Sequence, residues 1–188
     1  FKAVFAYTDT PEIHSGKYHF RIHDLVVPEE IDKISKVKKE NLGTHFVFPF
    51  NKPQKKAKDA VKEVERSLCG LGENTLLFLA HVRKIEYQLP AGKVGSQERI
   101  EHPDNLLEIC THHHDGKNSI THWLRFQKDV QITKDDGSVK SCQIAIAYSL
   151  QKNKGKKKNY AEWKVVPLDH SQVSIFFPAE KEVSNLKF

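Results

Sequence analysis

The clearest periodic signal in the chain is an amphipathic helix between residues 53 and 71. Apolar residues recur there at three- and four-residue spacing, at Ala57, Ala60, Val61, Val64, Leu68 and Leu71. That spacing puts the apolar side chains on one face of a helix, and the opposite face is mostly Lys and Glu. Gly70 and Gly72 are typical C-terminal stops. We predict a helix here, with its apolar face against a neighbouring sheet.

Before this helix the pattern predicts short strands. Residues 1–8 form an apolar run too short to distinguish a helical turn from a strand. Residues 12–15 and 17–23 are expected to be two strands joined by Ser15-Gly16, and the second alternates as a half-buried strand does. Residues 43–50 are rich in strand formers, and Pro49 stops that strand or places it at an edge. Between them, Pro28-Glu29-Glu30 predicts the start of a helix that ends before Gly43.

From residue 74 onward the pattern is mostly that of strands. The apolar run 75–82 predicts a buried strand, and 84–89 predicts an alternating one. Two hairpins are expected around Asp115-Gly116 and Asp135-Asp136-Gly137, with the longest strand over 139–150. Further strands over 160–168 and 173–177 complete an antiparallel meander. The chain as a whole is therefore predicted to be an α+β protein.

Composition is typical of a soluble globular protein. The chain has 188 residues, of which 38% are hydrophobic and 29% charged, enough for one large or two small domains. No apolar run approaches the ~20 residues of a membrane helix, so we expect no membrane partner. Three cysteines without a secretory signal indicate reduced thiols and a cytoplasmic location. The chain lacks Met and begins at Phe1, which indicates a fragment of a longer protein.

The beginning of the chain resembles a family of ATPases. Phe1-Lys2-Ala3-Val4-Phe5 and the stretch Thr8-Asp9-Thr10-Pro11-Glu12-Ile13-His14-Ser15-Gly16 are similar to the segment after the second glycine box of GHKL (Bergerat-fold) ATPases. The subgroup it resembles is the sacsin-like and ninety-kilodalton heat-shock-chaperone-like one. In that family a glycine-rich lid ends in Gly-x-Gly-Phe, a helix comes next, and a hairpin leads to a strand that opens with Gly-Thr. Phe1 corresponds to that Phe, and Thr44 to that Thr.

This resemblance implies an arrangement of domains. Residues 1–50 would be the C-terminal half of the ATP-binding domain, part of a Bergerat-type α/β sandwich. Residues 51–72 would be a connecting helix, and residues 73–188 an incomplete, β-rich transducer-like domain. The resemblance is specific over residues 1–50 and rests on the order of elements alone over 51–188.

The resemblance also implies a ligand, Mg-ATP, in the intact parent protein. Phe1, Lys2 and Ala3 would lie beside the triphosphate, because the first amides of a helix are unpaired and favour anions. The Thr44 hydroxyl would lie under the adenine. The magnesium ligand, the adenine-binding acid and the lid glycines would precede Phe1, so this chain has no catalytic or metal residue and is not expected to be active alone. A basic residue of the second domain would reach the terminal phosphate, and Arg83, Arg125 and Lys181 are candidates by charge.

The family resemblance further implies partners. Nucleotide closure would be transmitted to the second domain, to a homodimer partner and to a protein client. On this hypothesis residues 74–188 form a protein-interaction domain, and the helix over 53–71 couples it to the nucleotide site.

A metal site is one alternative for the histidine-rich segment. Cys110, His112 and His114 would share one face of a strand, and thiolate and imidazole suit zinc. A structural zinc site usually takes two separated pairs of ligands, and here only His122 and Cys142 are available nearby. A polar turn is the simpler interpretation.

Lysine clusters suggest a second class of function, a non-catalytic module that binds nucleic acid or an acidic protein partner. The net charge is +6, and much of the excess lies in Lys52, Lys55, Lys56, Lys58, Lys152, Lys154, Lys156, Lys157 and Lys158. Binding through such clusters would be weak and steeply salt-dependent. Solvated loops also carry such clusters, so this alternative stays open.

Overall fold

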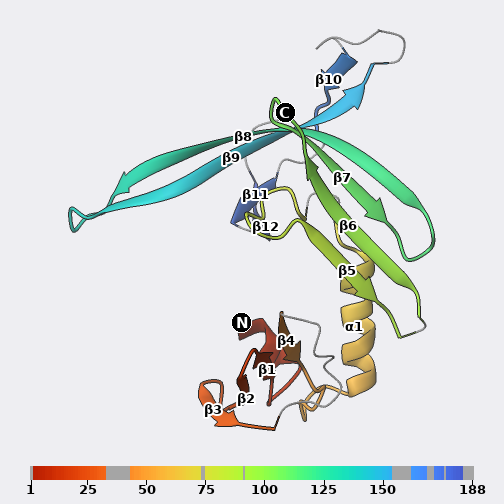
Figure 1. Cartoon of the computed structure of the whole chain (residues 1–188), viewed down its shortest axis with the longest axis vertical. Helices are drawn as coiled ribbons and strands as arrows, with labels where there is room; N and C mark the ends of the chain where they lie inside the picture. Colours follow the sequence, from red (N-terminus) through yellow and green to blue (C-terminus); the bar gives the residue numbers. More distant parts are fainter. Residues whose placement is uncertain are drawn as a thin grey trace. The chain divides into compact units, whose positions relative to one another are not determined.

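The computed structural model describes residues 2–32, 43–72, 75–90, 92–153, 162–168, 172–175 and 177–183. Contacts divide the chain into two compact units, Phe1–Ser67 and Leu68–Phe188. Most described residues lie in antiparallel strands, and the described part of the chain contains a single α-helix (Figure 1). The α+β class is therefore correct at this coarse level.

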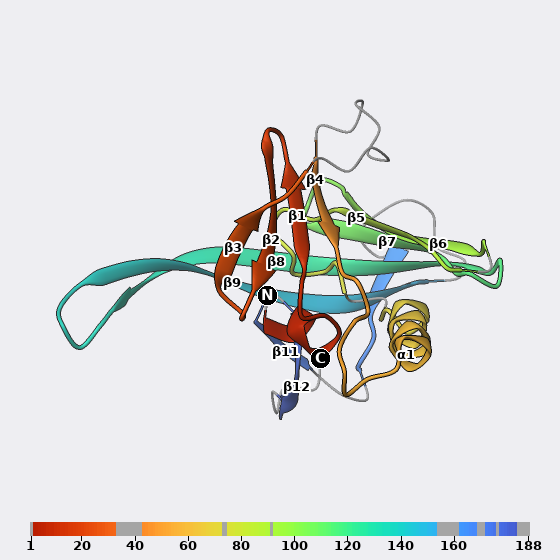
Figure 2. The ribbon, with the colours of Figure 1, turned by 90° about the horizontal axis from the view of Figure 1, so that it is seen from below.

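The first unit contains a short 3-10 helix and a four-stranded antiparallel sheet (Figure 2). The 3-10 helix η1 spans Lys2–Ala6. The strands run in the order β3-β2-β1-β4, with bounds β1 Glu12–Ser15, β2 Tyr18–His23, β3 Val27–Glu30 and β4 Thr44–Val47. The predicted hairpin of β1 and β2 is confirmed, with Gly16 at φ 56° in its turn. The predicted strand after Gly43 is also confirmed and lies at the edge of the sheet.

The predicted helix start at Pro28-Glu29-Glu30 is wrong. These residues belong to β3, where Pro28 lies opposite Ile22 of β2. Asp24 and Leu25 adopt positive φ in a tight turn that returns the chain along β2. β3 is at the sheet edge, where the missing N–H of Pro28 interrupts no ladder. The rest of the expected helix, over residues 33–42, lies outside the described residues.

The helix predicted over residues 53–71 is present but shorter. Helix α1 spans Ala57–Cys69. It begins late because residues 52–55 form a turn, in which the Lys55 amide donates to the Lys52 carbonyl at 3.1 Å. Ala60 is its fully buried residue. The boundary between the two units falls after Ser67, so most of α1 belongs to the first unit.

The second unit is built on a six-stranded antiparallel sheet in the order β10-β9-β8-β7-β6-β5. The bounds are β5 Lys84–Gln88, β6 Val94–Glu101, β7 Leu106–His112, β8 Asn118–Thr133, β9 Val139–Lys152 and β10 Trp163–Val165. Both predicted hairpins are confirmed, with Gly116 and Gly137 at φ 84° and 79°. The single strand β8 belongs to both hairpins. A separate pair contains β11 Gln172–Ile175 and β12 Phe177–Val183.

The strand predicted over residues 75–82 is also wrong, although its burial is correct. Residues 75–80 form turns rather than a strand. Their leucines nevertheless make the core of the second unit together with residues of β7 and β8: Leu76, Leu77, Leu79, Leu107, Ile109 and Trp123. The apolar pattern therefore identified the core but not the backbone conformation.

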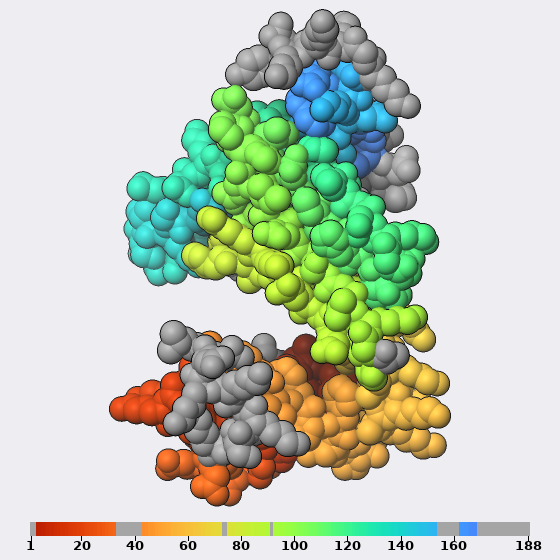
Figure 3. Space-filling model, turned by 45° about the vertical axis from the view of Figure 1, so that its right-hand side comes forward, coloured from red at the N-terminus to blue at the C-terminus, as the bar shows by residue number. Residues whose placement is uncertain are grey.

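Strands β8 and β9 extend beyond the rest of their sheet as a long two-stranded arm (Figure 1). Pairing of β8 with β7 ends at Leu124, and pairing of β9 with β10 begins at Leu150. From residue 126 to residue 148 the two strands pair only with each other within the described part of the chain. In Figure 3 the teal and cyan atoms of this arm project beside the green strands of the sheet. We call residues 126–148 the arm.

Candidate functional site

The predicted adenine-side residue, Thr44, opens the edge strand β4. It is exposed and lies opposite Ser15 of β1, with 2.8 Å between the two hydroxyl oxygens. Side chains alternate between the faces of a strand, so Thr44 and Ser15 share a sheet face with Ile13 and Phe46. This face therefore combines a hydroxyl pair with apolar side chains.

The same sheet face is incompletely covered by the described residues. Tyr18 and Phe46 lie on it and are 62% and 52% exposed. Phe20 of β2 lies opposite Ile13 and is half-buried. Aromatic and aliphatic groups beside a few hydroxyls are the usual lining of a small-molecule site.

The predicted phosphate-side residues lie at the beginning of η1. Phe1 is outside the described residues, and of Lys2 only the backbone is described. Ala3 is exposed in a 3-10 helix of five residues. A 3-10 turn still leaves its first amides unpaired, but its bonding geometry is poorer than that of an α-helix. The phosphate role of these three residues stays a prediction.

Side-chain hydrogen bonds and an ion pair join residues 8–10 of this unit to residues 51 and 52. Asn51 accepts hydrogen bonds from the Asp9 amide at 2.9 Å and the Thr8 hydroxyl at 3.2 Å. Its own amide donates to the Thr10 hydroxyl at 2.8 Å, and Lys52 forms an ion pair with Asp9. Thr8 is fully buried. The stretch that resembles the ATPase family is thus held against the segment after β4, and no sequence motif marks Asn51 for this role.

Helix α1 is tied to the N-terminal turn by a second polar cluster. The Tyr7 hydroxyl donates to Glu63 at 2.8 Å, and Lys55 also donates to Glu63. The hydrogen bonds from Lys55 and then Tyr7 lower the pKa of Glu63, and the same carboxylate raises the pKa values of both partners. The Lys55 ammonium lies 4.2 Å from the centre of the Tyr7 ring. Two lysines of the predicted basic cluster, Lys52 and Lys55, are therefore engaged within the unit.

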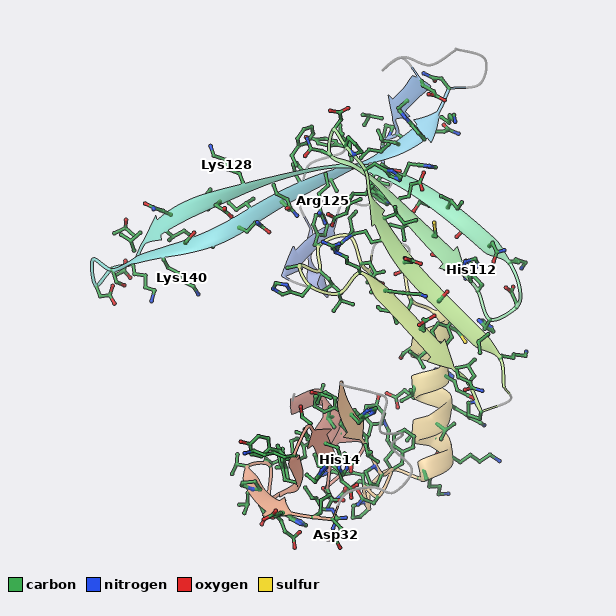
Figure 4. All side chains as sticks on the ribbon, viewed as in Figure 1. His14, Asp32, His112, Arg125, Lys128 and Lys140 are labelled. Atoms are coloured by element: carbon green, nitrogen blue, oxygen red, sulfur yellow. The ribbon has the colours of Figure 1, made fainter. Side chains whose placement is uncertain are left out.

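The opposite face of the sheet carries histidines in register. His14 of β1 lies between His19 of β2 and His45 of β4. The Nδ1 atoms of His14 and His19 are 3.0 Å apart, so one must donate and the other accept. His14 is 3% exposed, at the centre of the unit in Figure 4. Among the described residues, no group of His, Cys, Asp and Glu is arranged to hold a metal ion.

The proposed metal ligands of the second unit are dispersed. Cys110 and His112 share the outward face of β7, and His112 pairs with Asn118 at 2.7 Å. His122 instead bonds Glu108 at 3.1 Å, and Cys142 lies in the arm opposite Val130. Burial, followed by nearby carboxylates, raises the pKa of the Cys110 thiol above 9.0, which disfavours the thiolate that binds zinc.

The three basic candidates for a phosphate contact have different surroundings. Arg125, which Figure 4 labels, donates to the Leu77 carbonyl at 2.8 Å and pairs with Glu101 at 3.2 Å. It is therefore a structural residue of the second unit. Arg83 is exposed, and the side chain of Lys181 lies outside the part of the chain that the structure describes.

Sequence reasoning missed the buried polar face of β6. Gln97 and Arg99 point into the unit and are 1% and 4% exposed. Arg99 donates to the carbonyls of Leu76 and Leu79, which belong to the core turn. Burial, and next the charge of Arg125, lower the pKa of Arg99. Its role is to satisfy backbone groups that no strand reaches.

A comparison with known proteins finds a distant relative. The chain is 24% identical over 171 residues to Protein NO VEIN of Arabidopsis thaliana. The match covers 80% of this chain and 6% of the relative, so the chain spans a small part of that protein's length. No family model matches the chain, and no solved structure does. Within the described residues, no helix is long and apolar enough to cross a membrane.

Proposed function

We propose that the first unit is the latter part of a GHKL-type nucleotide-binding domain and that the intact protein binds Mg-ATP. The observation that carries this proposal is the position of Thr44. It directly follows Gly43, opens the edge strand, and pairs its hydroxyl with Ser15 at 2.8 Å on a sheet face with exposed aromatic side chains. The short helix η1, the hairpin and the Gly-Thr strand follow one another in the order that the resemblance implies, with β3 between the last two.

The chemistry of that face suits a purine. Phe46 and Ile13 would provide apolar surface for the ring, while the two hydroxyls supply a donor and an acceptor at its polar edge. A covering layer would complete the Bergerat-type sandwich and exclude water. On this proposal that layer, the magnesium ligand and the lid glycines belong to a segment upstream of Phe1.

The triphosphate would lie at the start of η1. Unpaired amides there would bind phosphate oxygens, and Lys2 would add a point charge. ATP hydrolysis in the intact protein would depend on positioning and charge stabilisation rather than on covalent chemistry with this chain. Because Arg125 is held by Leu77 and Glu101, it is the weakest of the three basic candidates for the phosphate contact that the resemblance implies. A chaperone-like role for the parent, with a client and a homodimer partner, is implied by the resemblance alone.

Calorimetric titration of Mg-ATP tests this proposal. The ligand is titrated into this chain and into a version extended upstream of Phe1. We expect binding by the extended version only, and about tenfold weaker binding by its Thr44→Val variant, the effect of one hydrogen bond. Thr133→Val, which removes an exposed strand hydroxyl from the second unit, is the matched control.

Two results would contradict the proposal. Binding by neither version would favour the non-catalytic interaction module instead. Tight binding by the short chain alone would show that the nucleotide site does not need an upstream half.

A further inference from the structure

The two faces of the arm differ in composition. Because β8 and β9 are antiparallel and in regular register, opposite residues share a face: Phe126 with Ile146, Lys128 with Ile144, Val130 with Cys142, and Ile132 with Lys140. The other face pairs mainly polar or small residues, such as Gln127 with Ala145 and Gln131 with Ser141, and carries Val139 near the tip of the arm. We call the first set the apolar face of the arm.

This apolar face is open to solvent. Ile144, Ile132 and Phe126 are 57%, 51% and 45% exposed, and Ile146 is 37% exposed. The arm is beyond the reach of β7 and β10, so the strands of its own sheet do not cover it. A row of large apolar side chains at this exposure is typical of a surface that binds another molecule.

The charges on the apolar face have one sign. Lys128 and Lys140 are the only charged residues of that set, since Asp129 belongs to the opposite face, where Gln143 donates to it at 3.3 Å. Figure 4 shows the two lysine side chains leaving opposite edges of the arm. The surface is therefore an apolar stripe with a cation on each edge. We propose that this apolar face binds an amphipathic, acidic helix of a partner protein.

The dimensions of the stripe agree with a helix. Two strands lie ~4.8 Å apart, so the stripe with its side chains is about as wide as an α-helix, ~10 Å. Lys128 and Lys140 are separated by four residue steps along the arm, which is ~13 Å at ~3.3 Å per residue. A helix rises ~13 Å in about nine residues, and positions nine apart lie on opposite flanks. One acidic residue on each flank, about nine residues apart, would therefore meet both lysines.

Charge also argues against self-association of two arms. Face-to-face pairing of two copies would bring four lysines to the edges of one interface, where like charges oppose binding. Nucleic acid would leave the apolar side chains without partners. An acidic helix satisfies both the apolar and the cationic parts of the surface.

A synthetic helix tests the proposal. The probe is a fluorescein-labelled peptide of about 18 residues, with Leu along one face, one Glu on each flank about nine residues apart, and Gln elsewhere. Fluorescence anisotropy measures its binding to the whole chain. We expect saturable binding, which Lys128→Glu with Lys140→Glu weakens at least about tenfold. The same double variant should gain affinity for a peptide in which both Glu are replaced by Lys.

Matched variants separate the apolar face from the rest of the arm. Ile132→Thr with Ile144→Thr should abolish binding, whereas Gln131→Thr with Gln143→Thr on the opposite face should not change it. All four substitutions keep or add β-branched side chains that suit a strand. Tryptophan fluorescence, to which Trp123 in the core of the second unit contributes, reports that each variant is folded.

Other outcomes would overturn the proposal. One is that the peptide does not bind up to about 1 mM. Another is that a peptide with the same residues in a non-amphipathic order binds equally well. A third is that the two matched pairs of variants lose the same amount of binding affinity. Concentration-dependent dimers in sedimentation that Ile132→Thr with Ile144→Thr removes would make a second copy the occupant instead. Binding to phosphatidylserine vesicles but not to the peptide would make the face a lipid-binding one.

Discussion

Asn51 accepts a hydrogen bond from the backbone amide of Asp9 at 2.9 Å, across 42 residues of sequence. The bond joins the turn before β1 to the segment after β4. Two further hydrogen bonds, to the hydroxyls of Thr8 and Thr10, make Asn51 the centre of a small network. Asn51 thus links two segments of the first unit that are far apart in the sequence.

Replacement of Asn51 by Ala should loosen the first unit. The variant removes three hydrogen bonds and leaves the buried Thr8 hydroxyl without its acceptor, so we expect a loss of about 1–2 kcal/mol in unfolding free energy. Hydrogen exchange of residues 8–15, measured by mass spectrometry, reports on this region. Asn118→Ala, in the second unit, is the control and should leave that exchange unchanged. Equal protection of residues 8–15 in wild type and Asn51→Ala would mean that the network does not stabilise the unit.

Arg99 should have a larger effect on the second unit. In Arg99→Met the carbonyls of Leu76 and Leu79 lose their donor inside the core, and leaving buried polar groups unsatisfied costs about 2–4 kcal/mol. Removing a buried charge offsets part of that cost, which keeps the figure below the sum of the two bonds. Urea unfolding followed by tryptophan fluorescence measures the change, because Trp123 packs in the same core cluster and Trp163 lies in β10 of the same unit.

The exposed Arg83 provides the control for Arg99. Arg83→Met should change stability by less than about 0.5 kcal/mol, as surface substitutions usually do. Arg99→Lys should recover only part of the loss, because a lysine has one nitrogen, whereas Arg99 bonds the two carbonyls through Nη1 and pairs with Glu101 through Nη2 at 3.1 Å. If Arg99→Met were as stable as wild type, water or a backbone shift would have to satisfy those carbonyls.

Local signals account for the elements that the sequence predicts correctly. The Asp-Gly turns at Gly116 and Gly137 determine the two hairpins of the large sheet, and both glycines have the positive φ that such turns require. The three- and four-residue spacing over 57–69 likewise specifies α1. Each of these signals lies within a few residues of the structure it determines.

Long-range interactions account for the errors. Strand β6 buries Gly95, Gln97 and Arg99 and exposes Val94 at its beginning, the reverse of the usual pattern. The Tyr87 ring lies over Gly95 and occupies the space that a Cβ would take, with atoms at 2.3 Å. Arg99 allows residues 76–79 to be buried without forming a strand, because its guanidinium donates to backbone carbonyls that a neighbouring strand would otherwise pair with. No pattern within β6 or within residues 76–79 indicates that these two segments are in contact.

The candidate site was predicted only in part, for a similar reason. Thr44 can be predicted from a local motif, because it follows Gly43 and precedes a run of strand formers. Its partner Ser15 depends on the register of β1 and β4, which 29 residues of sequence separate. Asn51 comes after an ordinary Pro-Phe pair, and its role appears only when the chain is folded.

The carboxylate of Glu63 should make the first unit sensitive to acid. Lys55 and Tyr7 hold its pKa below the ordinary value of 4.5. A group whose folded pKa is depressed contributes stability that is present above the unfolded pKa and is lost as the pH falls through the folded pKa. The loss should therefore occur below about pH 4.5, and salt should reduce it because the pair is exposed.

Glu63→Gln should be less stable than wild type at neutral pH, and this difference should shrink below about pH 4.5. Hydrogen exchange of residues 2–10 across an acid series measures it, with Glu65→Gln as a control that removes a charge from the same helix. Curves for wild type and Glu63→Gln that stay parallel into strong acid would show that the pair with Lys55 and Tyr7 does not stabilise the folded unit.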